Sequence, residues 1–129
     1  MPPVITALYG ALNALLNVFL AERVTRMRRV HNTSIGQGDA EPLLVAIRAH
    51  ANNAEFVPLA IVMMLLVELC GGSTLYLHIT GGLLFVGRIA HAFGLPRRSP
   101  NPYRFSGVVI TLGAIVASSA YVLYLRSQV

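Results

Sequence analysis

Charged and polar side chains with helical spacing interrupt apolar stretches of this sequence. Arg48, Asn52 and Glu55 follow an i, i+4, i+7 pattern, which places them on one helix face within roughly 60°. Arg88 and His91 lie about one turn apart and share a face in the same way. Arginine suits bidentate contacts with carboxylates or phosphates. Several arginines with one carboxylate predict a site for a ligand with more than one acidic group and one ammonium group.

The composition indicates that these side chains belong to a membrane protein. The chain has 129 residues, of which 55% are hydrophobic and 12% charged, and its mean hydropathy is +0.64. Soluble domains carry about 25% charged residues, so a disordered chain and a typical soluble enzyme domain are excluded. A membrane-spanning helix needs about 20 apolar residues, so the length allows four spans with short loops. We therefore expect residues 1–129 to form a single all-α domain, an integral membrane four-helix bundle.

Four apolar runs are predicted to be the spans of this bundle. Glycine- and proline-rich segments separate them, and Pro42 and the pair Asn101–Pro102 are typical of helix starts. The runs cover residues 4–21, about 42–69, about 74–93 and about 102–125.

The arginines predict how the bundle is oriented. All 10 basic residues are arginines, against 5 acidic residues, and most of them follow the first and third runs. By the positive-inside rule both of these loops are cytoplasmic and both termini lie outside. Nucleic-acid binding is not expected, because most of the surface must face lipid. No metal site is expected either, since the 4 histidines lack ligand-type spacing with cysteine or carboxylate.

The energy of charge burial limits where these side chains can point. A lipid-facing charge costs about 2.5–3.5 kcal/mol near the bilayer centre, so Arg48, Glu55 and Arg88 must face the bundle interior, a subunit interface or a wet cavity. Arg26 lies at the end of the first predicted helix, beyond its apolar run, and Arg104 lies at the start of the fourth, so all four helices contribute to one polar layer. An alternative is an internal ion-pair network in which Arg48 or Arg88 neutralises Glu55.

Two segments resemble a known family. RAHANNAEFVP, residues 48–58, resembles the helix-2 signature R-x-x-x-N-x-x-E-x-x-P of the MAPEG family, the membrane-associated proteins in eicosanoid and glutathione metabolism. GRIAHAFG, residues 87–94, is similar to the helix-3 segment of the family, and Arg104 stands where the family has a helix-4 arginine. The resemblance covers nearly the whole chain and is closest to the small bacterial inner-membrane members.

The resemblance implies a homotrimer that binds glutathione between neighbouring subunits near the cytoplasmic face. Arg48, Asn52 and Glu55 would hold the tripeptide, with Glu55 on its ammonium group. Arg88 and His91 match ligand-contacting positions on helix 3. The implied activity is that of a glutathione transferase or peroxidase that activates the bound thiol against hydrophobic electrophiles, and membrane lipids are further expected partners.

Two arginines complete the implied site. Arg26, or else Arg28, matches a helix-1 arginine supplied by the neighbouring subunit, and Arg104 matches the arginine that stabilises the thiolate. A thiol attacks only as the thiolate, and a nearby cation lowers its pKa.

Two positions depart from the family pattern. Phe56 and Leu95 stand where several members have tyrosines whose hydroxyls contact glutathione. An alternative function is therefore a non-catalytic lipid- or ligand-binding membrane protein of the same fold. A proton-coupled exporter is disfavoured, because the first helix has no carboxylate before Glu22.

Four further polar positions have predicted structural roles. Asn13 and Asn17 stand one turn apart among small residues, which favours close helix packing and a trimer contact. Asn53 is expected to make a helix–helix hydrogen bond. Glu68, near the outer end of the second run, is expected to be solvated.

Overall fold

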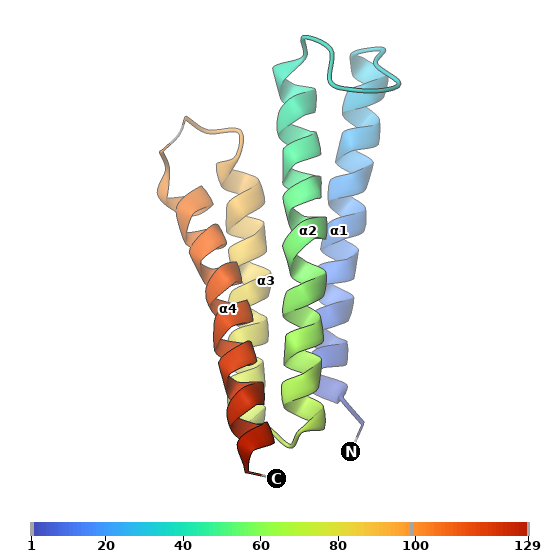
Figure 1. Cartoon of the computed structure of the whole chain (residues 1–129). Helices are drawn as coiled ribbons and strands as arrows, with labels where there is room; N and C mark the ends of the chain where they lie inside the picture. Colours follow the sequence, from blue (N-terminus) through green and yellow to red (C-terminus); the bar gives the residue numbers. More distant parts are fainter. Residues whose placement is uncertain (1, 99, 129) are drawn as a thin grey trace.

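The computed structural model describes residues 2–98 and 100–128, which form an up-and-down bundle of four α-helices (Figure 1). The chain termini lie at one end of the bundle, and the α1–α2 and α3–α4 loops lie at the other (Figure 1). The predicted all-α bundle is therefore confirmed. The helices are α1 Val4–Val30, α2 Glu41–Leu69, α3 Thr74–Gly94 and α4 Pro102–Ser127.

The helix starts follow the capping chemistry of the sequence. The Ser73 side chain accepts from the Tyr76 amide at the start of α3, and the Asn101 side chain accepts from the Arg104 amide, 2.9 Å away, at the start of α4. α1 continues well past the apolar run because arginine is a good helix former and favours the C-terminal end of the helix dipole. Arg28 then closes the α1–α2 loop by donating to the carbonyl of Gly36 at 2.9 Å.

The outer surface of the bundle matches a bilayer. By length and composition α1, α2 and α4 can each cross a membrane. α3 has 21 residues, about 31 Å at 1.5 Å per residue, which also matches the hydrocarbon thickness. Arg88 and His91 lower its average hydropathy, but both are buried in the bundle. The lipid-facing stripe of α3 is apolar and consists of Leu75, Ile79, Leu83, Val86, Ile89 and Phe93.

Glycines let α3 and α4 approach each other closely. A Cβ added at Gly107 would lie 2.5 Å from the carbonyl oxygen of Gly87 and 2.6 Å from the Cβ of His91. Any larger residue at this position would push the two helices apart. The contact brings the N-terminal part of α4 against the polar part of α3.

Glu68 joins the outer ends of α1 and α2. Its carboxylate accepts from the backbone N–H groups of Ile5, at 2.9 Å, and Thr6, at 2.7 Å. α1 begins after Pro3 and has no side-chain cap of its own, so a carboxylate from α2 satisfies its first-turn donors. Glu68 is partly exposed, as expected for a solvated position, and its carboxylate has the additional role of capping α1.

This cap can be tested by substitution. Glu68→Ala should lower the free energy of unfolding by about 1–2 kcal/mol, because two amide donors lose their acceptor. Glu68→Gln keeps one carbonyl acceptor and should cost less. The measurement is unfolding in mixed detergent micelles followed by circular dichroism, with Glu22→Ala, an exposed position on α1, as the matched control. Equal stability of the two alanine variants would contradict the capping role.

Candidate functional site

The guanidinium of Arg88 lies at the centre of a buried polar cluster. The residue is 1% exposed. Its Nε donates to Asn53 Oδ1 at 3.1 Å, its Nη2 donates to Asn52 Oδ1 at 2.8 Å, and its Nη1 donates to Thr111 Oγ1 at 3.4 Å. Nη2 also lies 3.4 Å from His91 Nδ1. One side chain of α3 thereby ties together α2, α3 and α4.

The cluster also reaches α1. Asn53 Nδ2 donates to Asn17 Oδ1 at 3.1 Å, so the expected helix–helix hydrogen bond of Asn53 is confirmed. In the part of the chain that the structure describes, the hydrogen-bond partners of Arg88 are all uncharged, and Glu55 is exposed on α2. Among the described residues of this single chain, Arg88 and Glu55 therefore do not form the ion pair that was the alternative. The dipoles of these hydrogen-bond partners solvate the positive charge of Arg88, but none of the partners carries a negative charge that would neutralise it.

A small cavity borders this charge, although Arg88 itself is almost fully buried. A cavity of about 20 Å³ lies between α2, α3 and α4, and its lining residues are Asn52, Phe56, Arg88, Val108, Thr111 and Leu112. A hollow of about 220 Å³ lies beside it at the start of α4, and its lining residues are Pro100, Asn101, Arg104, Phe105 and Val108. Val108 borders both spaces. Arg104 and the buried guanidinium therefore border two neighbouring spaces that share Val108.

The predicted site residues divide into two groups. Arg88, His91 and Asn52 are brought into direct contact. The other four predicted residues are exposed on the single chain: Arg26, Arg48, Glu55 and Arg104. Arg48 and Glu55 share with Asn52 one face of α2, so the half-buried Asn52 connects the exposed charges to the buried cluster.

The structure separates the two helix-1 candidates. Arg28 Nη1 donates to loop carbonyls, including that of Thr33 at 3.4 Å and that of Ser34 at 3.3 Å. Arg26 is exposed. Arg26 is therefore the better placed of the two for a contact outside its own chain.

Sequence reasoning missed two members of the cluster, Asn17 and Thr111. A signal for Thr111 is present in α4, where Gly107, Thr111, Ala114 and Ser118 are the buried residues and recur at helical spacing. The Thr111 hydroxyl is fixed by its own hydrogen bond to the Gly107 carbonyl at 2.7 Å, which leaves its oxygen lone pairs toward Arg88.

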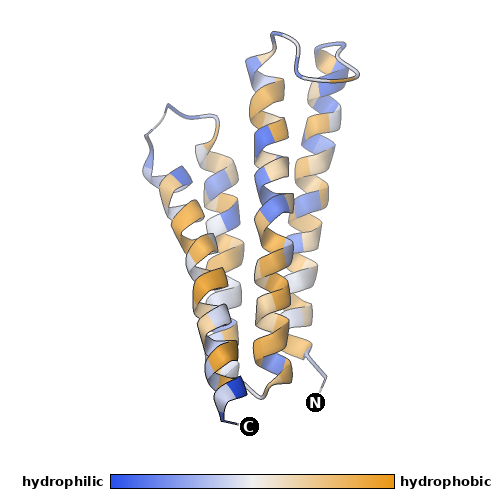
Figure 2. Cartoon of the chain, viewed as in Figure 1, coloured by the Kyte–Doolittle hydropathy of each residue, from blue (hydrophilic) through white to orange (hydrophobic). Residues whose placement is uncertain are grey.

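The polar layer lies near one end of the membrane-spanning region. Arg88 is six residues from the end of α3, about 9 Å along the helix axis. Figure 2 shows that hydrophilic positions on the helices concentrate in the half of the bundle that carries the α1–α2 and α3–α4 loops. This half also holds the arginines of those loops, so the electrostatic potential there favours anions.

These features define an integral membrane four-helix bundle with an arginine-centred polar layer near one end. A family model described as MAPEG family matches residues 6–124. The chain therefore belongs to the MAPEG family, which confirms the resemblance carried by residues 48–58 and 87–94.

Two similar proteins cover most of the chain. The protein named "Inner membrane protein YecN" from Escherichia coli strain K12 is 38% identical over 112 residues, which span 87% of this chain and 85% of that protein. The protein of the same name from Escherichia coli O6:H1 matches to the same extent.

The structural role of Arg88 predicts a large effect of substitution. Arg88→Met should lower the free energy of unfolding by about 2–5 kcal/mol, because it leaves buried oxygens of Asn52 and Asn53 without donors. Thr111→Val removes only the long contact and should cost about 1 kcal/mol. Unfolding in detergent checks both, with Arg126→Met, at an exposed position on α4, as the control. An Arg88→Met protein as stable as the parent would refute the cluster as the centre of the bundle.

Proposed function

We propose that this protein binds glutathione and activates its thiol against hydrophobic electrophiles, as a transferase or peroxidase. Membership of the MAPEG family supports a glutathione-related role in a membrane. The observation that carries the proposal is the face of α2 where exposed Arg48 and Glu55 flank Asn52, whose side chain oxygen is 2.8 Å from Arg88 Nη2. Cationic and anionic groups in this arrangement complement the carboxylates and the ammonium group of the tripeptide.

The same face supports assembly with further copies of the chain. Arg48 and Glu55 are exposed on one chain, yet a lipid-facing charge in a membrane-spanning helix costs up to about 2.5–3.5 kcal/mol. Covering by a second subunit removes this cost and closes a pocket around the ligand. We propose a homotrimer in which Arg26 of the partner subunit adds a further cation to each site.

Each side chain has a distinct role in the proposed site. Arg48, Asn52 and Glu55 hold the tripeptide backbone, while Arg88 fixes the Asn52 side chain from behind and His91 contacts Arg88. Arg104 follows the N-terminal cap of α4, where the helix dipole also favours an anion. A guanidinium there stabilises the thiolate, which is the nucleophilic form of the thiol.

Phe56 affects which residues must stabilise the thiolate in the proposed site. It is half-buried and borders the crevice beside Arg88, where it presents a ring without a hydroxyl group. Stabilisation of the thiolate therefore falls to Arg104 and to the positive potential of the layer. If that stabilisation is too weak, the protein binds ligands without turnover, which is the alternative function that the experiment below separates.

The proposed location is the bacterial inner membrane, because the relatives at 38% identity are named inner membrane proteins. The arginine-rich loops would then face the cytoplasm and both termini would lie outside. This orientation places the proposed thiol site near the cytoplasmic surface.

Measurements of glutathione binding and of turnover separate the proposed roles of Arg48 and Arg104. In detergent, Arg48→Ala should weaken glutathione binding about tenfold or more, measured by titration calorimetry. Arg104→Ala should lower the rate of conjugation to 1-chloro-2,4-dinitrobenzene about tenfold to a hundredfold with a smaller effect on binding, because it removes the cation beside the thiolate. Native mass spectrometry of the same samples reports the subunit number.

Arg126→Ala, on exposed α4 surface away from the site, is the matched control and should behave as the parent. Parent-like binding and turnover in both site variants would refute the site assignment. Glutathione binding by the parent with no turnover would favour the non-catalytic alternative.

A further inference from the structure

An arginine is stacked on two aromatic rings where the lipid-facing stripe of α3 ends. The guanidinium carbon of Arg97 lies 3.3 Å from the centre of the Phe93 ring and 5.7 Å from the centre of the Tyr103 ring. The two rings lie edge to face, with their centres 5.5 Å apart. All three side chains are exposed, and together they are here called the Arg97 patch.

The contacts of Arg97 fix its guanidinium in one orientation. Its Nη1 donates to the carbonyl of Phe93, and its backbone amide donates to the carbonyl of Gly94 at 3.0 Å. The ring of Phe93 adds a cation–π contact. A guanidinium has five N–H donors, and among the described residues the Phe93 carbonyl is the hydrogen-bond acceptor of this side chain. The other N–H groups therefore remain for a ligand that approaches from outside the bundle.

The α3–α4 hairpin supplies no anion for this patch. No aspartate or glutamate follows Glu68 in the sequence, whereas five arginines do. The helices α3 and α4 and the loop between them therefore carry no carboxylate side chain, and Arg98 adds a second cation next to Arg97. The positive charge of the patch favours an anion from outside the hairpin.

The patch lies where the headgroups of a bilayer would be. Phe93 is the last member of the lipid-facing stripe of α3, and Arg97 lies three residues past Gly94, the last residue of α3. Tyrosine is enriched at the interface between membrane and water, because its ring is apolar and its hydroxyl group is polar. An acyl chain that lies along Ile89 and Phe93 therefore places its headgroup beside Arg97.

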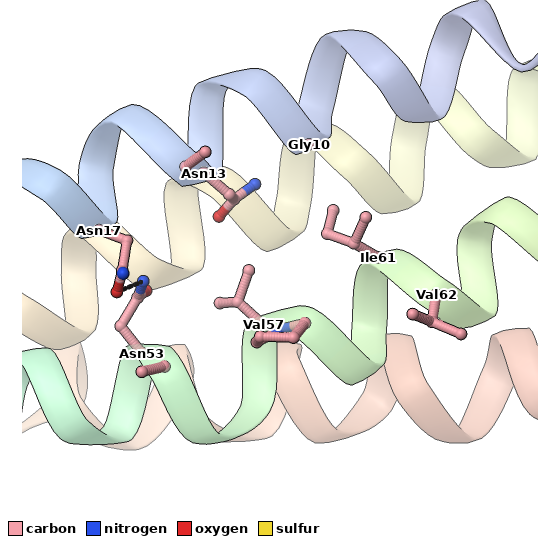
Figure 3. Close-up of a pocket in the computed structure, with 10 residues that line it drawn as sticks. Gly10, Asn13, Asn17, Asn53, Val57, Ile61 and Val62 are labelled. Carbon is pink, nitrogen blue, oxygen red and sulfur yellow. Dashed lines mark hydrogen bonds between the residues drawn. The ribbon is translucent and has the colours of Figure 1, made fainter.

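The patch faces away from the polar cluster. His91 is buried in that cluster, and Phe93, two residues later, lies about 200° further around α3. The cluster continues to α2 and α1, where Asn53 donates to Asn17 (Figure 3). The Arg97 patch is therefore separate from the proposed thiol site.

We propose that the Arg97 patch binds the phosphate of an anionic phospholipid, in the leaflet at the loop end of the bundle, with an acyl chain along the α3 stripe. A phosphate accepts the paired N–H groups of an arginine. An anionic headgroup is favoured over phosphatidylcholine, because the ammonium group of phosphatidylcholine is repelled by the arginines. A lipid is favoured over free phosphate, because its acyl chain also gains apolar contact with α3.

Tryptophan fluorescence tests this site, because the chain has no tryptophan of its own. Phe93→Trp keeps a ring beneath the guanidinium and introduces a single emitter into the patch. The full-length variant is reconstituted in phosphatidylcholine vesicles that contain increasing fractions of a quencher. The quencher is phosphatidylglycerol or phosphatidylcholine with bromine on the acyl chains near the headgroup. We expect phosphatidylglycerol to bind at the patch about fivefold to tenfold more strongly than phosphatidylcholine.

Two arginine substitutions separate the patch from the general positive potential. In the Phe93→Trp background, Arg97→Gln should lower the preference for phosphatidylglycerol about fivefold, because it removes the stacked cation. Arg29→Gln removes an exposed arginine from α1 at the same end of the bundle, so it is the matched control and should keep the preference. Circular dichroism confirms that each variant is folded.

Four results would overturn the proposal. Equal quenching by the two lipids would show that the patch does not select an anionic headgroup, and equal losses in Arg97→Gln and Arg29→Gln would show a general attraction only. Loss of the preference in excess inorganic phosphate, at constant ionic strength, would make the ligand a soluble anion. Absence of quenching by either lipid would show that another subunit covers the patch. The proposal does not rest on the thiol site, and glutathione titration of the same variants reports on that site separately.

Discussion

The buried guanidinium of Arg88 is the interaction on which the rest of the structure depends. A cation in an apolar interior is tolerated only when its N–H groups meet oriented acceptors, and two amides, a hydroxyl and an imidazole provide them here. These partners are uncharged, so they lower the cost of burial and leave the field of the cation intact. In surroundings of low dielectric constant such a field acts more strongly on a nearby anion than it would in water.

The packing of small residues serves this arrangement. Gly107 lies against Gly87 and His91, and this contact brings α4 close enough for Thr111 to reach Arg88. Bulkier residues would give more apolar contact between α3 and α4, but they would move the hydroxyl out of range and leave one donor of Arg88 unpaired. Gly87 and Gly107 therefore serve two purposes. They let α3 and α4 pack closely in lipid, and they bring Thr111 within reach of Arg88.

The sequence predicted the helices because apolar runs and capping residues are local signals: α3 begins at Thr74 and α4 at Pro102, as expected. The end of α1 was set too early by hydropathy, since arginines continue a helix outside the hydrocarbon. Spacing also placed Asn52 and Glu55 on one face. It did not reveal Thr111 as an acceptor, nor Glu68 as the cap of α1, because both contacts join helices far apart in sequence and depend on which faces meet.

The two adjacent asparagines explain why α2 carries two different surfaces. Successive residues on a helix are about 100° apart, so Asn52 borders the crevice while Asn53 turns toward α1, and both oxygens still accept from Arg88. The side of α2 beyond Asn52 presents Arg48 and Glu55, which lipid disfavours, whereas the side beyond Asn53 faces α1, where Asn53 donates to Asn17. This difference between the two sides is the physical basis for proposing that the charged face of α2 takes part in assembly and thiol binding.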